Sequence, residues 1–195
     1  MPEPGAAVTL YTIGHSTRPL DDFLGLLERE GVRSLVDVRT FPGSRRYPHF
    51  NREALAAALR ERGVAYSHAP ALGGRRRPRP DSPNVAWRNE GFRGYADHMA
   101  TPEFRAALSG LLDAAAATPT TVMCSEAVPW RCHRSLIADA ALARGARVLH
   151  IMDGGAKPHT LTRFARVEGG EVRYDAGADD AAAAAAPASL FDAAE

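Results

Sequence analysis

The stretch PLDDFLGLLEREGVRSLVDV, residues Pro19 to Val38, decides the fold class. Its first part predicts an amphipathic helix, because four apolar residues recur at helical spacing. These are Leu20, Phe23, Leu24 and Leu27. Gly31 is a typical helix stop, and the following SLVDV is almost wholly apolar, as buried strands of a parallel sheet are. The stretch therefore predicts a helix that leads into a buried strand.

The same alternation continues on both sides of this unit. Strands are predicted over residues 8–13, 64–68, 120–123 and 147–151, and helices over 51–62, 91–99, 102–116 and 131–144. Residues 164–174 suggest a helical turn and an edge strand. Alternating strands and helices predict a single α/β domain over residues 1–175, with a mostly parallel sheet of about five strands flanked by helices in a three-layer sandwich. Residues 176–195 are Ala-rich and low in complexity, which predicts a disordered tail.

Composition narrows the classes of protein to consider. The 195 residues carry a net charge of +1 and are 45% hydrophobic, the balance of a soluble globular protein. A protein that coats nucleic acid would be far more basic, so any anion binding should be local. Two cysteines cannot form a disulfide scaffold, and no leader or membrane-length apolar run is visible. We therefore expect a cytoplasmic protein without a membrane partner.

Polar, reactive side chains follow every predicted strand. They are His15 and Ser16, Asp37 and Arg39, His68, Cys124 and Glu126, and His150. The carboxyl ends of parallel strands meet at one edge of the sheet, where ligands of such folds bind. Ordinary loop polarity is the alternative, but these residue types favour a site.

The densest chemistry lies in MCSEAVPWRCHR, residues Met123 to Arg134, which hold both cysteines. At the start of a helix, Arg131 and Arg134 would favour an anion and lower the pKa of a nearby thiol. Cys124 and Cys132 are therefore candidate nucleophiles. The spacing from Cys124 to Arg131 is one residue longer than the C-x5-R of cysteine phosphatases, and Cys132 could simply pack as a small apolar residue.

A metal site is the next alternative. Cys124, Cys132 and His133 could be ligands, joined by His15 from another strand. The spacings are not those of zinc fingers or ribbons. The adjacency of Cys132 and His133 would also make joint ligation of one ion awkward on a helix.

Two loops are rich in arginine. FPGSRRYPHF interleaves basic and aromatic residues, including Ser44 and Arg45, and GGRRRPRP adds four more arginines. Together they predict a local positive patch that could hold a nucleotide or stack the bases of a single strand. For GGRRRPRP, the alternative is a flexible, solvated loop.

Asp37 and Arg39 share one face of their strand, which suits a site at its end. The alternative for these two residues is a structural ion pair.

The ordered motifs TIGHS, LVDVRTFPGSRRYPHFN, LGG, GYADHM, CSEAVPWRCHR and VLHI resemble those of the bacterial and archaeal family known as domain of unknown function 488. The resemblance runs from about Leu10 to about Thr162. It implies an α/β fold and a site at matching positions, and it supplies no reaction. Those positions are Gly14, His15, Ser16, Asp37, Arg39, Pro42, Ser44, Phe50, Gly73, Gly74, Tyr95, Cys124, Glu126, Cys132, His133 and Arg134.

The leading hypothesis is an enzyme, a hydrolase or a transferase, that binds a phosphate-bearing small molecule or nucleotide at the strand ends. Its candidate catalytic residues are His15, Asp37, Cys124, Glu126 and His133. Its candidate anion-binding residues are Ser16, Arg39, Ser44, Arg45, Gly73, Gly74, Tyr95, Arg131, Cys132 and Arg134. No cofactor can be named from the sequence.

Three alternatives stay open. One is a nucleic-acid-associated protein, linked to repair, and another is a metal-binding protein that uses Cys124, Cys132 and His133. Leu190 and Phe191 in the tail also resemble the end of peptides that dock bacterial sliding clamps, although the usual preceding glutamine is missing.

Overall fold

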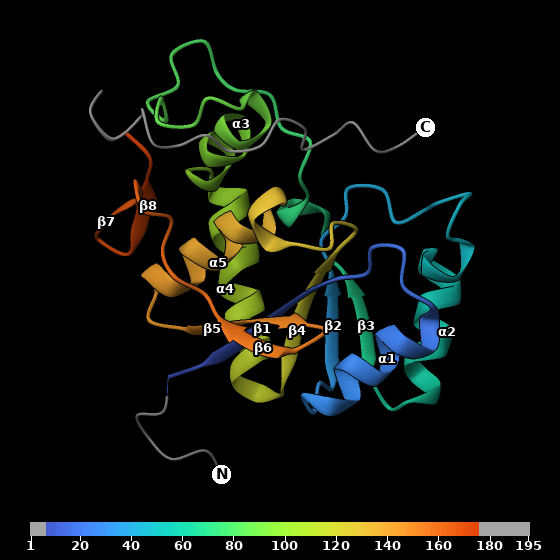
Figure 1. Ribbon diagram of the computed structural model, residues 1–195. Coiled ribbons are helices and arrows are strands. Elements are labelled where there is room, and N and C mark those ends of the chain that lie inside the picture. Colours follow the sequence, from blue (N-terminus) through green and yellow to red (C-terminus); the bar gives the residue numbers. More distant parts are fainter. Residues whose placement is uncertain (1–6, 176–195) are drawn as a thin grey trace.

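A six-stranded sheet forms the centre of the computed structural model, which describes residues 7–175 (Figure 1). The strand order is β3-β2-β4-β1-β5-β6. Five strands are parallel, and β6 pairs antiparallel with β5 at the edge. The strands are β1 (Thr9–Gly14), β2 (Ser34–Asp37), β3 (Ala65–His68), β4 (Thr120–Cys124), β5 (Arg147–Met152) and β6 (Gly155–Pro158).

Five helices cover the two faces of the sheet, which makes the predicted three-layer α/β domain. Helices α1 (Leu20–Arg29) and α2 (Arg52–Glu61) pack on one face, around a core that includes Phe23, Leu35 and Leu59. The opposite face carries α3 (Glu90–Met99), α4 (Pro102–Ala117) and α5 (Arg134–Ala143) over the larger core. Short 3-10 turns are η1 (Pro48–Phe50), η2 (Pro70–Leu72) and η3 (Pro129–Arg131).

Local chemistry explains how these helices begin and end. The Asn89 side chain accepts a hydrogen bond from the Phe92 amide, and Thr101 accepts one from Phe104, so both residues cap helices. Gly31 ends α1 with a φ of +66°, a left-handed conformation that costs glycine little. These signals explain why the predicted order of helices and strands is confirmed through β5.

The structure differs from the sequence prediction after β5. The sheet has six strands rather than five, because Asp153 and Gly154 join β5 to β6 in a two-residue hairpin. Residues 164–174 hold no edge strand of the main sheet. They form a separate hairpin of β7 (Arg166–Glu168) and β8 (Glu171–Arg173), whose turn, Gly169-Gly170, has positive φ at both positions.

Two further expectations concern the tail of the chain and membrane spans. Residues 176–195, including Leu190 and Phe191, lie outside the described residues, as do residues 1–6. Among the helices of residues 7–175, none is both long and apolar enough to cross a membrane.

Candidate functional site

At the carboxyl edge of the sheet, the loops that follow strands β2, β4 and β1 turn toward different faces of the sheet. The chain leaves β1 and β2 toward α1 and α2 on one face, and it leaves β4 toward α5 on the other (Figure 1). β4 lies between β2 and β1 in the sheet. Open α/β sheets usually bind ligands at such a reversal, in a crevice beyond the strand ends, and we call this region the crevice. The loop after β4 carries Cys124, Glu126 and Cys132 to this point.

One side of the crevice is a buried ion pair. The Arg39 guanidinium donates to both Asp37 carboxylate oxygens, with Nε at 2.9 Å from Oδ1 and the nearer Nη at 2.6 Å from Oδ2. The Tyr66 hydroxyl also donates to Asp37, at 2.8 Å. Asp37 is fully buried and Arg39 nearly so. A buried, fully hydrogen-bonded ion pair positions the neighbouring loops.

The same arginine holds His15. An Arg39 Nη lies 3.3 Å from His15 Nε2, and His15 Nδ1 donates to the Ser16 carbonyl at 2.9 Å. The imidazole stacks on Phe50, with the ring centroids 4.2 Å apart. Burial, aided by the Arg39 charge, lowers the pKa of His15 to about 4. A neutral imidazole with both nitrogens engaged suits a structural role better than proton transfer near neutral pH.

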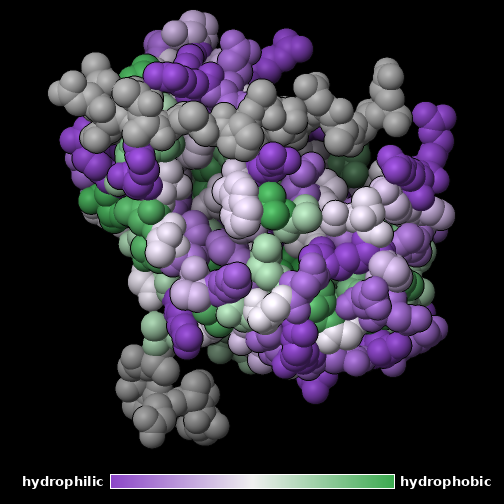
Figure 2. Space-filling model, viewed as in Figure 1, coloured by the Kyte–Doolittle hydropathy of each residue, from purple (hydrophilic) through white to green (hydrophobic). Residues whose placement is uncertain are grey.

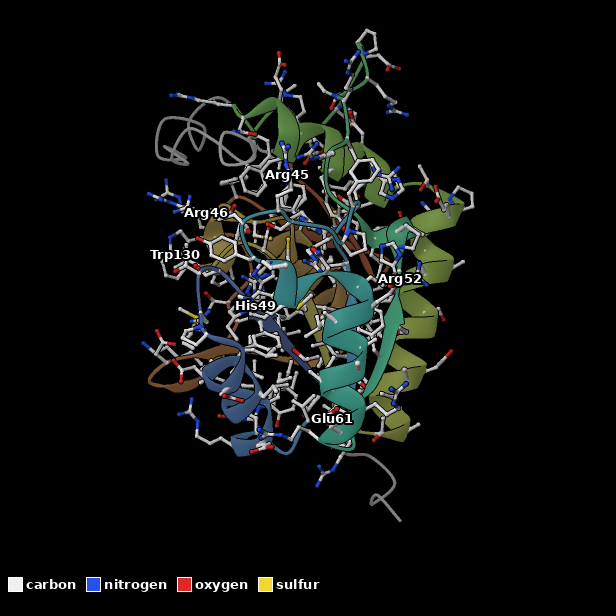
Figure 3. All side chains as sticks on the ribbon, turned by 90° about the vertical axis from the view of Figure 1, so that its right-hand side faces the viewer. Arg45, Arg46, His49, Arg52, Glu61 and Trp130 are labelled. Atoms are coloured by element: carbon white, nitrogen blue, oxygen red, sulfur yellow. The ribbon has the colours of Figure 1, made fainter. Side chains whose placement is uncertain are left out.

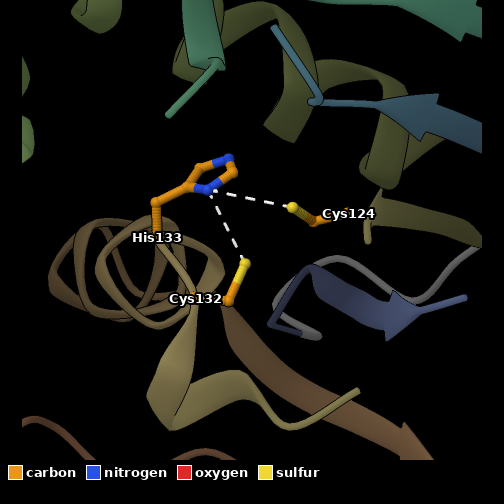
Figure 4. A group of neighbouring side chains, drawn as sticks. All are labelled: Cys124, Cys132 and His133. Atoms are coloured by element: carbon orange, nitrogen blue, oxygen red, sulfur yellow. Dashed lines mark hydrogen bonds between the residues drawn. The ribbon is translucent and has the colours of Figure 1, made fainter. Parts of the chain in front are cut away.

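The other side of the crevice is a cluster of two thiols and an imidazole (Figure 4). His133 Nδ1 lies 3.6 Å from Cys132 Sγ and 3.9 Å from Cys124 Sγ. The three ligand atoms lie within 4.8 Å of one another, and all three residues are buried. The cluster therefore joins the end of β4 to the beginning of α5.

A backbone contact orients the His133 ring. Its Nε2 lies 3.2 Å from the Val38 carbonyl, which can only accept, so Nε2 carries the proton. Nδ1 then presents a lone pair to the two sulfur atoms. Histidines that bind metals show the same arrangement, with the second ring nitrogen donating to a carbonyl or carboxylate.

The adjacency of Cys132 and His133 presents no obstacle, contrary to the sequence expectation. The predicted helix from residue 131 begins only at Arg134, because Pro129 starts the 3-10 turn η3 instead. Cys132 has extended backbone, with φ −136° and ψ 146°, and His133 opens the helix. The change of conformation between the two residues turns both side chains to the same side.

A buried arginine lies next to the thiols. Arg134 is 1% exposed, and its guanidinium donates to the Thr12 hydroxyl at 3.2 Å and to the Glu126 carbonyl at 2.5 Å. A hydrogen bond from the Cys132 thiol, supported by positive charge that includes Arg134, holds the pKa of Cys124 well below its usual range. Burial raises the pKa of Cys132 well above its usual range. The pKa values of the two neighbouring thiols are therefore shifted in opposite directions.

Two residues shape the space around His133. A Cβ at Gly74 would lie 2.9 Å from His133 Nδ1, so a side chain there would crowd the lone pair. The Tyr95 ring packs 5.1 Å from the imidazole, and its hydroxyl donates to the Leu72 carbonyl at 2.8 Å. Gly74 and Tyr95 therefore fix the position of the imidazole.

Glu126 follows Cys124 by two residues and is half-buried. Burial, together with the nearby Cys124 charge, raises the pKa of its carboxyl group. Within residues 7–175 its carboxylate makes no hydrogen bond, although its carbonyl accepts one from Arg134. A carboxylate without a structural partner beside a ligand cluster is a candidate proton acceptor.

The remaining predicted residues contribute no ligand atom to the cluster. Ser44 stabilises its own loop, because its backbone amide donates a hydrogen bond to Asn51 Oδ1 at 2.6 Å. Gly73 packs against Thr40, while Arg45 and Arg131 are exposed to solvent. Ser16 has a φ of 50° in the turn after β1.

Sequence reasoning missed a buried chain of hydrogen bonds beside the cluster. His150 Nδ1 lies 2.7 Å from the Thr12 hydroxyl, and its Nε2 lies 2.9 Å from His159 Nδ1. His159 Nε2 lies 2.8 Å from Asp139, which also accepts from the Tyr174 hydroxyl. The sequence marked only His150 as a strand-end residue. Its partner His159 lies directly after β6, so a correct prediction of the β5–β6 hairpin would have placed the two histidines side by side.

Two hollows in the surface of the described residues have no sulfur atom of the cluster in their lining. One lies between α3, α4 and the β7–β8 hairpin, and its lining includes Met99, Phe104 and Val172. A shallower one beside the crevice is lined by residues that include Ser16, Arg18 and Ala127. Neither contains Cys124, Cys132 or His133, which agrees with the burial of the cluster.

Fold and site together define a three-layer α/β protein with a thiol–imidazole cluster at the carboxyl edge of its sheet. The family model "Domain of unknown function DUF488" matches residues 19–141, from the residue before α1 to the last turn of α5. The chain therefore belongs to the DUF488 family, and the match includes Cys124, Cys132 and His133. No curated protein and no solved structure matches the chain.

Proposed function

We propose that the protein is a metal-dependent hydrolase, in which Cys124, Cys132 and His133 bind one zinc ion. The observation that carries the proposal is the convergence of two sulfur atoms and His133 Nδ1 within 4.8 Å. Zinc bonds of about 2.3 Å to sulfur and 2.05 Å to nitrogen, at tetrahedral angles, place these atoms about 3.6 Å apart. The distances of 3.6 and 3.9 Å lie close to that value.

The number of ligands favours a reactive site over a structural one. Structural zinc sites have four protein ligands, whereas three ligands leave a position for water. Among the described residues, the cluster contains three such groups. A zinc ion held there would supply a bound water of lowered pKa. Glu126, half-buried and two residues from Cys124, would be the residue placed to hold a proton.

The geometry favours a ligand role over a nucleophilic role for Cys124. His133 Nδ1 faces both sulfur atoms, an arrangement that suits three groups holding one ion. The Arg39 and Arg134 groups, predicted to bind an anion, already donate to Asp37, Phe50, Thr12 and Glu126. Binding of a phosphate-bearing substrate stays a prediction, and it now depends on exposed arginines such as Arg45 and Arg131.

Metal titration of the reduced full-length chain tests the proposal. We expect one zinc ion per chain, and a thiolate-to-metal charge-transfer band when cobalt replaces zinc. Cys124→Ser, Cys132→Ser and His133→Gln should each weaken zinc binding by at least about 100-fold, since losing a partner that only orients a metal ligand already costs about 10- to 100-fold.

His49→Gln is the matched control, because His49 lies in the loop after β2 and is outside the cluster. Its zinc affinity should equal that of the wild type. Weak wild-type binding that the serine variants leave unchanged would refute the metal site. If a variant misfolds, the cobalt spectrum of the wild type still decides, because a site without sulfur gives no charge-transfer band.

A further inference from the structure

The loops around the crevice form a strongly basic rim. Residues 40–51, 73–89 and 125–132 follow the adjacent strands β2, β3 and β4, and together they contain eight arginines and two carboxylates. The whole chain has a net charge of only +1. The positive charge is therefore concentrated at the edge where the thiol–imidazole cluster lies.

Six of these arginines are exposed and make no ion pair with any residue in the described part of the chain. They are Arg45, Arg46, Arg75, Arg77, Arg88 and Arg131. We call them the rim arginines. Figure 2 shows hydrophilic side chains over the loop that follows β2 and over the loop between β3 and α3. Uncompensated guanidinium groups on a single edge favour a ligand that carries several phosphates.

Exposed aromatic rings accompany the rim arginines. Phe41 is 71% exposed and Trp130 is 60% exposed, which is unusual for rings of this size. The Arg75 guanidinium lies 5.9 Å from the centroid of the Phe41 ring, and Arg46 lies 5.4 Å from that of Tyr47. In Figure 3, Arg46 and Trp130 lie near each other at the left, Arg45 lies above them, and Glu61 lies toward the bottom of the molecule.

We infer that this rim binds single-stranded nucleic acid. Flat rings that alternate with guanidinium groups stack unpaired bases and contact the phosphates between them. Three separate loops supply the contacts, which suits several successive nucleotides better than one. Within the three rim loops, the regular elements are the 3-10 turns η1 and η3, so these loops present no α-helix to a duplex groove. The inference deepens the proposed function by naming the substrate class of the same site, and to that extent it rests on that function.

Fluorescence anisotropy with a labelled 20-nucleotide oligothymidine measures the binding directly. It is done on the full chain with zinc removed by a chelator, and then repeated with zinc. We expect binding in both states, with an affinity that falls steeply with salt. Binding in the zinc-free state depends only on the rim, so a failure of the metal site leaves this result intact.

Paired variants show which residues are responsible. Arg45→Gln with Arg46→Gln should reduce the slope of log affinity against log salt by about 0.7 for each lost phosphate contact. Trp130→Ala should weaken binding about 10-fold at every salt concentration, since a stacked base is lost. The matched control is Arg33→Gln with Arg147→Gln, two exposed arginines at the opposite edge of the sheet, and it should bind like the wild type.

Three results would overturn the inference. The first is no binding of the oligonucleotide at low salt. The second is an equal loss of binding in the rim and control variants, which would show attraction without a site. The third is equally tight binding of polyglutamate or of anionic vesicles, which would show that bases contribute nothing.

Discussion

At the scale of the residue, the site depends on which atom of each polar side chain is already engaged. Arg39 directs its guanidinium to Asp37 and Phe50, and His15 uses both ring nitrogens on near neighbours. By contrast, His133 uses only Nε2 on the backbone and directs Nδ1 toward the two thiols. The sequence identified all of these as candidate residues. It could not show which of these side chains are already engaged in structural contacts, because those contacts join residues that are distant in sequence.

Gly74 provides a test at this scale. A methyl group there would come within 2.9 Å of His133 Nδ1 and force the ring to move. We expect Gly74→Ala to weaken zinc binding about 10- to 100-fold, as changes next to metal ligands do.

Competition with a chromophoric chelator measures this affinity. Gly43→Ala is the control, because a Cβ at Gly43 has open space around it. Unchanged zinc affinity in Gly74→Ala, in a folded protein, would contradict the placement of the metal at Nδ1.

At the scale of the element, the loop from β4 to α5 was the hardest segment to predict. Its pattern suggested a helix from residue 131, but Pro129 forms a 3-10 turn and α5 begins at Arg134. This shift of three residues in the start of the helix decides whether Cys132 and His133 can bind the same metal ion. The β5–β6 hairpin was missed although Asp153-Gly154 is a strong hairpin signal, because the following GAKP has little strand propensity.

The hydrogen-bond chain from Thr12 to Asp139 gives an element-scale prediction about pH. The chain is satisfied when one ring nitrogen of His150 donates and the other accepts, toward Thr12 and His159, and His159 donates to Asp139. His150 is then neutral. Burial, with the charges of His159 and Arg134, lowers the pKa of His150 from 6.5 to about 3. A second proton on His150 would have no acceptor.

The sign of the effect follows from proton binding. Between pH 6.5 and pH 3 the unfolded chain holds a proton on His150 that the folded chain does not, so stability falls as the pH falls. Between pH 8 and pH 5 we expect His150 to account for a loss of about 2 kcal/mol in the free energy of unfolding. His15, with its pKa lowered to about 4, acts in the same direction.

Urea unfolding of the zinc-free protein at both pH values measures this loss. His150→Gln removes the titrating group, so its stability should fall about 2 kcal/mol less over the same interval. The comparison uses the difference between two pH values, and it therefore holds even if the variant is less stable at both. An identical pH dependence in the two proteins would contradict the buried, neutral state of His150.

At the scale of the whole molecule, strand and helix order could be predicted because each unit carries its own signal. Pro19–Val38 shows this, with an apolar helix face, a glycine stop and a buried strand. Strand order could not be predicted, since it depends on packing between units. That order, β3-β2-β4-β1-β5-β6, is what places β4 between strands whose loops leave toward the opposite face. The crevice is a property of the topology, and the cluster is a property of one loop within it.

Zinc-edge X-ray absorption of the zinc-loaded, full-length chain tests the central claim most directly. The account predicts two sulfur neighbours at about 2.3 Å and lighter nitrogen or oxygen neighbours at about 2.0–2.1 Å, with one sulfur lost in Cys132→Ser. A shell that consists only of nitrogen and oxygen, unaltered in Cys132→Ser, would contradict it.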